Sequence, residues 1–255
     1  LVIGKYVSTA YVGFYTRSNY FKSILSTNLE CSIGRVRYPV LSEIQGDPLK
    51  RKSGYKMLLK NTMYLSFILM AGMAAVAEPM IITLIGEKWR PSIIYLQMLC
   101  FVGALYPLHA LNLNMLNVKG RSDLFLNLEI IKKILAVPTI IIGIIWGIKV
   151  MILGMRINSL IAYYLNSYYS GRLINYPMKE QVKDILPGFL MALFMGALVF
   201  FLGWILPFNY LTKLMIQLFL GVILVLSLGE VFKFGPYMEI KDIVTSKLFR
   251  KNYAR

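Results

Sequence analysis

The apolar residues of this chain are gathered into long, nearly uninterrupted blocks. The two clearest lie near residues 185–206 and 210–228, and each has about the 20 residues that an α-helix needs to cross roughly 30 Å of hydrocarbon. A membrane β-barrel would instead need apolar and polar residues to alternate. Hydrophobic residues make up 57% of the 255 residues and charged residues only 16%, unlike an ordinary soluble domain. The sequence therefore predicts an all-α integral membrane protein.

The blocks predict a polytopic helical bundle of about seven transmembrane helices. We place the spans near residues 10–33, 57–86, 92–116, 124–148, 150–169, 185–206 and 210–228. The first span is the least regular, and it could run on as helix toward Pro39. We read residues 1–9 as the end of a truncated preceding transmembrane helix, residues 10–230 as the bundle and residues 231–255 as a basic tail.

Basic residues outnumber acidic ones by 28 to 12, which gives a formal net charge of +16. With seven spans the loops alternate between the two sides, and we assign 16 basic residues to one side and 5 to the other. Since lysine and arginine favour the cytoplasmic side, we expect the basic side and the C-terminus to face the cytoplasm. Topology and contact with anionic membrane lipids explain most of the charge, so no nucleic-acid partner is needed.

Charged residues also fall inside the predicted spans, where cations outnumber anions. A charge at the centre of a bilayer costs about 2.5–3.5 kcal/mol on insertion scales, so these side chains must reach the interface or line water. The cations are Arg17, Lys22, Arg35, Arg37, Lys132, Lys133 and Arg156, and the anions are Glu30, Glu78 and Glu129. Lys132 and Lys133 follow Glu129 at a spacing that favours ion pairs on a helix, which leaves pairing and a cavity role equally open for them.

Arg17, Asn28 and Arg35 are predicted to share one face of the first span. At about 100° per residue, Asn28 lies about 20° from Arg17 around the helix, and Arg35 lies directly in line with Arg17. Such a stripe suits the wall of a hydrophilic cavity, and Lys22 is a further candidate. The alternative is that the arginines reach the interfaces, with an unrelated asparagine between them.

A second polar seam follows Pro107. It consists of His109, Asn112, Asn114 and Asn117. At membrane depth such groups form helix contacts, satisfy carbonyls freed by the proline, or donate to a sugar hydroxyl. Glu78, just before Pro79, is either a candidate for coupling to a proton or cation, or the mark of a helix end. Glu30 is the second candidate for ion coupling.

The sequence contains little that indicates catalysis or metal binding. It has one histidine and two cysteines, without a nucleophile motif or metal-ligand spacing. We therefore expect no catalytic residue, no metal site and no cofactor. Taken alone, the residues indicate a transporter-like bundle with a cationic cavity.

A set of local motifs is nevertheless recognisable. It comprises the opening IGKYVSTAYVGFYTRS, residues 35–45 (RVRYPVLSEIQ), residues 86–99 (GEKWRPSIIYLQML) and residues 109–133 (HALNLNMLNVKGRSDLFLNLEIIKK). Together these segments resemble the C-terminal half of Wzx-like flippases for lipopolysaccharide and O-antigen. Those flippases are part of the multidrug/oligosaccharidyl-lipid/polysaccharide exporter superfamily, which is MATE-like. The motif residues are Pro39, Gln45, Gly86, Trp89, Lys119, Gly120 and Arg121.

The resemblance implies one lobe of a two-lobe transporter in the bacterial cytoplasmic membrane. Such a protein would move an undecaprenyl-pyrophosphate-linked oligosaccharide by alternating access, together with a missing N-terminal lobe and other polysaccharide assembly proteins. The residues that would line its substrate cavity are Arg17, Lys22, Asn28, Arg35, His109 and Asn112. Arginine can hold phosphate oxygens through two parallel hydrogen bonds.

Three other interpretations are open at this stage. A cation-coupled multidrug exporter of the same superfamily would have the same fold but an acidic, aromatic cavity. A membrane glycosyltransferase or O-antigen polymerase would need a large loop with catalytic carboxylates. A gene remnant would have no activity.

Overall fold

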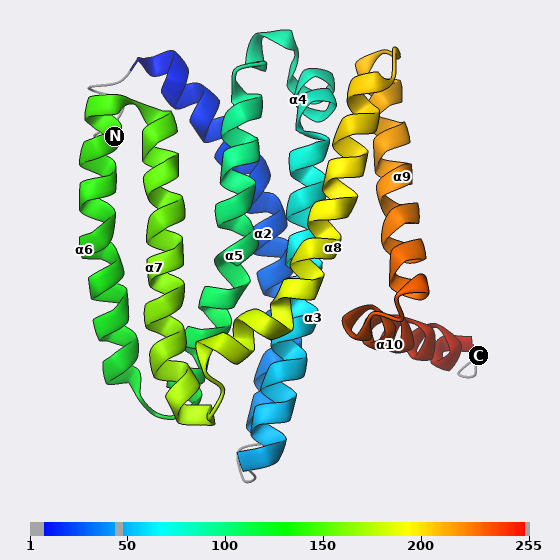
Figure 1. The fold of residues 1–255 in the computed structure, drawn as a ribbon. Helices are drawn as coiled ribbons and strands as arrows, with labels where there is room; N and C mark the ends of the chain where they lie inside the picture. The colour runs from blue at the N-terminus through cyan, green and yellow to red at the C-terminus, as the bar shows by residue number, and fades with distance from the viewer. Residues whose placement is uncertain (1–7, 44–47, 253–255) are drawn as a thin grey trace.

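The computed structural model describes residues 8–43 and 48–252, with the backbone alone for residues 30–43, 48–51, 243–244 and 246–252. Within these ranges the regular structure is helical and contains no strand, which confirms the predicted all-α fold. The helices run up and down in a bundle, with α6 and α7 at one edge and α9 at the other (Figure 1). In chain order they are α2 (Thr9–Glu43), α3 (Pro48–Ala75), α4 (Ala77–Ile85), the 3-10 turn η1 (Glu87–Trp89), α5 (Ser92–Val118), α6 (Ser122–Trp146), α7 (Ile148–Ile174), α8 (Met178–Ile205), α9 (Tyr210–Val231) and α10 (Gly235–Asn252).

The structure supports five of the predicted spans by length and hydropathy. Among the described residues, the helices that pass this test are α3 from Lys52 onward, α5, α7, α8 and α9. The helices α2 and α6 are not among them. The chain is thus a multi-pass helical membrane protein, and the count of seven spans stays a prediction.

The span predicted over residues 57–86 is divided in the structure. The helix stops at Ala75, Val76 forms a turn, and α4 begins at Ala77. Pro79 explains the break, because a proline has no N–H to donate to the carbonyl four residues earlier and its ring crowds that carbonyl. Four residues before Pro79 is Ala75, the last residue of α3.

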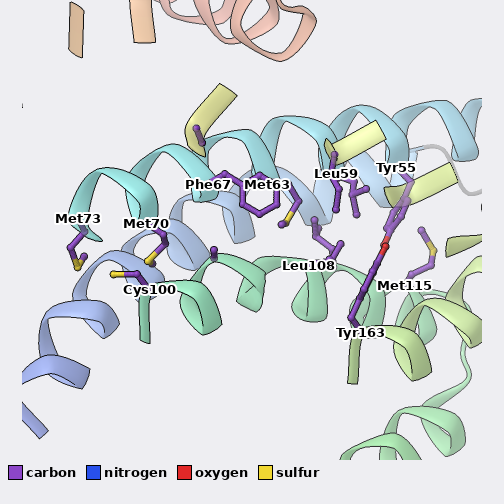
Figure 2. Packing of buried hydrophobic residues seen from close by; sticks show 14 of the residues in the cluster. Tyr55, Leu59, Met63, Phe67, Met70, Met73, Cys100, Leu108, Met115 and Tyr163 are labelled. Carbon is purple, nitrogen blue, oxygen red and sulfur yellow. The ribbon is translucent and has the colours of Figure 1, made fainter. Parts of the chain in front are cut away.

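The core lies where α3 packs between α5 and α8. Figure 2 shows its apolar side chains arranged along α3 and facing α5, from Met73 at one end to Tyr55 at the other. Tyr55, Leu59 and Met63 are fully buried. This core holds α5 in place, and α5 in turn supplies one wall of the cavity described below.

The tail that follows α9 forms a helix of its own, α10, which lies across the lower end of α9 (Figure 1). It is docked by specific contacts to two other helices. A Cβ on Gly229 of α9 would lie 2.5 Å from Cγ of Tyr237, so that glycine leaves room for the ring. The Asn61 amide of α3 donates to Glu239 at 2.6 Å, and Lys241 pairs with Glu230 of α9.

The turn between α7 and α8 requires glycine at position 171. The backbone N–H of Tyr176 donates to the Gly171 carbonyl at 2.8 Å as the chain reverses through Asn175, which has φ of 52°. A Cβ at position 171 would lie 2.7 Å from the Tyr176 carbonyl oxygen. That atom belongs to the backbone, so it cannot move aside as a side chain would.

We therefore expect Gly171→Ala to lower the free energy of unfolding by about 1–3 kcal/mol, the usual cost of overpacking. The matched control is Gly72→Ala in α3, where a Cβ would find its nearest neighbour, Met195 Cε, at 4.0 Å. Thermal melting of the purified protein in detergent measures both. Equal melting temperatures for the two variants would contradict this account of the turn.

Candidate functional site

A cavity of about 730 Å³ lies between α5, α6 and α7, with Tyr15 of α2 also in its lining. We call it the α5–α7 chamber. It exists because α6 packs mainly on α7 and only slightly on α5, which leaves space between α5 and α6. Its polar lining residues come from all three helices: His109, Asn114, Glu129, Lys132, Thr139, Asn158 and Ser159.

The polar groups of the chamber are largely paired with one another. Lys132 forms an ion pair with Glu129, so the two charges offset each other locally. The ring Nε2 of His109 lies 2.9 Å from Ser159 Oγ. Asn158 donates to Thr139 Oγ1 at 2.6 Å and to the Leu135 carbonyl at 2.9 Å. The result is a hydrogen-bonding interior without a net formal charge when His109 is neutral.

Arg17 and Asn28 lie apart from the chamber, since neither is in its lining. Both side chains are exposed, as expected for two residues on one face of a continuous helix. Arg17 stacks over the Trp89 ring with its Cζ 5.5 Å from the ring centroid. Arg35 and Glu30 are on the same helix, but their side chains lie outside the described part of the chain. We call the exposed surface around Arg17 and Asn28 the α2 face.

Lys22 is half-buried between α2 and α5 rather than on the α2 face. Its Cγ and Cδ lie 3.0 Å from the place where a Cβ on Gly103 would be. The aliphatic stem therefore fills the space that this glycine leaves. A long lysine stem can pack in this way while its ammonium reaches toward a more polar region.

Asn112 is fully buried and belongs to a network that joins four helices. Its Oδ1 accepts hydrogen bonds from Tyr55 of α3 at 3.0 Å and from Ser170 of α7 at 2.6 Å. Its Nδ2 donates to the Leu108 carbonyl at 3.0 Å and to Gln181 of α8 at 3.4 Å. Figure 2 shows the hydroxyl ends of Tyr55 and Tyr163 pointing toward one another in the same region. Of the two residues predicted on α5, His109 lines the chamber and Asn112 does not.

Glu78 lies at the end of the bundle where α4 turns into α5. It pairs with Arg90 at 3.0 Å, and Arg90 also donates to Glu87 at 2.5 Å and to the Tyr210 hydroxyl at 2.7 Å. These hydrogen bonds to Glu87 and Tyr210 raise the pKa of the Arg90 guanidinium above its ordinary value. Glu78 is part of this ion-pair cluster and is not among the chamber's lining residues, so its role in ion coupling stays a prediction.

The Lys119–Arg121 motif is the turn between α5 and α6. Gly120 has φ of 69°, its N–H donates to the Asn117 carbonyl, and the Arg121 N–H donates to the Leu116 carbonyl, both at 2.9 Å. These two bonds define a Schellman cap, which favours glycine at that position. Arg121 also pairs with Asp123 at 2.8 Å, and its hydrogen bond lowers the pKa of Asp123 to about 2.

The other motif residues lie in α2 and around η1, apart from Gln45. Gly86 has φ of 93° and allows the turn from α4 into η1. The Trp89 ring packs edge-on against Phe14 of α2. Pro39 lies within α2, and Gln45 lies outside the described residues.

Several chamber residues were missed by the reasoning from sequence. Tyr15, Thr139, Asn158 and Ser159 all line the cavity but were not candidates. The adjacent polar pair Asn158 and Ser159, inside a predicted span, was the available signal.

Comparison with known proteins supports the resemblance seen in the motifs. A family model described as "Polysaccharide biosynthesis protein" matches residues 1–94, which include α2, α3, α4 and the first residues of α5. The lipopolysaccharide biosynthesis protein WzxC of Escherichia coli (strain K12) is 26% identical over 170 residues, which is 67% of this chain and 34% of that protein. An uncharacterised membrane protein in the cps region of Klebsiella pneumoniae is 26% identical over 168 residues, 64% of this chain and 35% of that protein.

A third relative is the teichuronic acid biosynthesis protein TuaB of Bacillus subtilis (strain 168). It is 27% identical over 124 residues, which is 49% of this chain and 26% of that protein. The chain spans about a third of the length of the first two of these curated relatives. No solved structure gives a significant match.

The fold defines a polytopic helical membrane protein with a polar chamber among its helices. The comparisons confirm, over part of the chain, its resemblance to the Wzx-like polysaccharide flippases.

The network around Asn112 predicts a structural role for that residue. Replacing it with alanine removes the acceptor for two buried hydroxyls, and each buried group left unpaired costs about 1–3 kcal/mol. We expect Asn112→Ala to lower the melting temperature clearly, whereas Asn28→Ala on the exposed α2 face should change stability by no more than about 0.5 kcal/mol. Thermal melting in detergent compares them, and an Asn112→Ala protein that melts like the unmodified one would refute this role.

Proposed function

We propose that this chain is part of a flippase that carries a lipid-linked oligosaccharide across the bacterial cytoplasmic membrane. The observation on which the proposal depends is the α2 face, where Arg17 is exposed and no carboxylate of the described residues forms an ion pair with it. An exposed guanidinium within a predicted span costs free energy against lipid. That cost disappears if the face borders an aqueous path and meets an anion there.

The substrate chemistry fits such a face. An undecaprenyl-pyrophosphate carrier has phosphate oxygens that a guanidinium binds through paired hydrogen bonds. Asn28 adds an amide on the same face, and Arg35 continues the predicted stripe. The polyprenyl chain stays in lipid throughout. The second lobe would lie opposite the α2 face, and rocking of the two lobes would expose the site to each side in turn.

The multidrug-exporter alternative is less well supported by the described residues. A cationic drug needs a free carboxylate, but Glu129 in the chamber is paired with Lys132, and Glu78 is paired with Arg90. No catalytic arrangement among the described residues favours a glycosyltransferase or polymerase. A transporter remains the function that the geometry supports best.

In the full-length protein, we expect Arg17→Gln with Arg35→Gln to reduce surface polysaccharide roughly tenfold or more, the usual scale for losing charge-assisted hydrogen bonds to a phosphate. Polysaccharide at the cell surface is measured by immunoblot, with the amount of protein in the membrane fraction measured in parallel. Lys88→Gln is the matched control, because Lys88 is an exposed cation in the turn next to Trp89. Normal export by the double variant would remove these arginines from the mechanism.

The proposed topology places the C-terminus and the α7–α8 turn in the cytoplasm and η1 on the opposite side. Single cysteines at Lys183 and Lys88, both exposed, test it in whole cells. A thiol reagent that cannot cross the membrane should label Lys88→Cys and leave Lys183→Cys unlabelled until the cells are opened. Labelling of both in intact cells, or the reverse pattern, would contradict the assignment.

A further inference from the structure

We propose that the α5–α7 chamber binds a sugar residue of the glycan, separately from the phosphate-binding α2 face. This inference rests on the proposed function and adds a second binding site to it. It predicts that the residues lining the chamber influence which glycan is accepted. Those on the α2 face would contact the pyrophosphate that every such substrate shares.

The size of the chamber suits a saccharide. Its volume of about 730 Å³ lies in the usual range of small-molecule sites, about 300–1,000 Å³. Such sites are mostly apolar, with a few polar groups from several directions. In the chamber these groups are the amides of Asn114 and Asn158 and the hydroxyl of Ser159, on two different helices.

The hydrogen-bonding chemistry also suits a sugar. A sugar hydroxyl both donates and accepts hydrogen bonds. The Nδ2 groups of Asn158 and Asn114 already donate within the protein, to Leu135 and Thr139 and to the Ala110 carbonyl, so their side-chain oxygens are the acceptors that a sugar hydroxyl would meet. Tyr106 is 43% exposed and contributes an aromatic ring to the lining, as does the half-buried Tyr15. Aromatic rings give apolar surface with a polar tip, so they can cover the C–H face of a sugar ring while the amides meet its hydroxyls.

The charge of the chamber argues against phosphate. Lys132 is its cationic lining residue, and Glu129 is already paired with it. A pyrophosphate brought there would have to displace Glu129 and leave that carboxylate partly buried without its partner, which is costly. On the α2 face, Arg17 has an aromatic neighbour but no ion pair among the described side chains. The α5–α7 chamber therefore favours a neutral, hydroxylated ligand, and the α2 face favours an anionic one.

Cysteine protection in the purified full-length protein tests this division. The chamber reporter is Ala136→Cys, a small lining residue of α6, with Ala110→Cys of α5 as a second reporter in case the first variant fails to fold. The reporter for the α2 face is Thr27→Cys, an exposed neighbour of Asn28. All other cysteines are replaced by alanine. Labelling rates with a maleimide are measured without ligand, with undecaprenyl pyrophosphate, and with the lipid-linked repeat unit of the host.

We expect the glycan-bearing lipid to slow labelling at both the chamber and the α2 face by roughly fivefold or more, as a bound ligand buries most of its site. Undecaprenyl pyrophosphate without sugar should slow labelling only at Thr27→Cys. That pattern would support the sugar site.

Four other outcomes would overturn it. If the glycan-bearing lipid protects Thr27→Cys alone, the flippase proposal stands and the sugar site fails. If bare undecaprenyl pyrophosphate protects the chamber equally, the chamber holds another part of the carrier. If both chamber reporters resist labelling without ligand, the rest of the polypeptide covers the cavity. If neither lipid protects any position, the proposed function itself fails.

Discussion

Hydrocarbon offers no hydrogen-bond partner, and this constraint acts on every polar group of the bundle. Backbone groups are satisfied by helix formation, and several interior polar side chains find partners on neighbouring helices, although both polar atoms of the buried Asn166 have none in the described structure. Asn112 does so with four hydrogen bonds, Asn158 with two, and Lys132 with an ion pair to Glu129. Arg17 is exposed and stacked on Trp89, and like Arg156 and Lys133 it forms no ion pair with a described carboxylate. The α2 face is defined by this exposed guanidinium together with Asn28 on the same side of the helix.

The polar features of the bundle fall into regions with separate tasks. The network at Asn112 connects α3, α5, α7 and α8, so it fixes how these helices meet. The chamber lies on another side of α5 and leaves space that this network does not fill. The cluster around Arg90 connects α4, η1 and α9 at one end of the bundle. The network at Asn112 and the chamber therefore occupy different sides of α5.

Most of the helices could be predicted from sequence, because apolar blocks of membrane-spanning length constrain the chain strongly. Their ends are set by local chemistry, as at Gly120 and Pro79. The site was harder to predict. His109 and Asn112 are three residues apart on one helix, yet one faces the chamber and the other the core. That difference depends on where α6, α7 and α8 lie around α5. The pattern of residues along α5 alone gives no information about those positions. Asn158 and Ser159 were missed for the same reason.

The docking of α10 has a mechanical consequence. Tyr237 occupies the notch at Gly229, and Lys241 reaches back to Glu230 on α9, while Glu239 is held by Asn61 of α3. The helix α10 thus contacts both α9 and α3, which are distant from each other in sequence. Sliding of α9 along α3 would break at least one of these contacts, so α10 links the movement of α9 to that of α3.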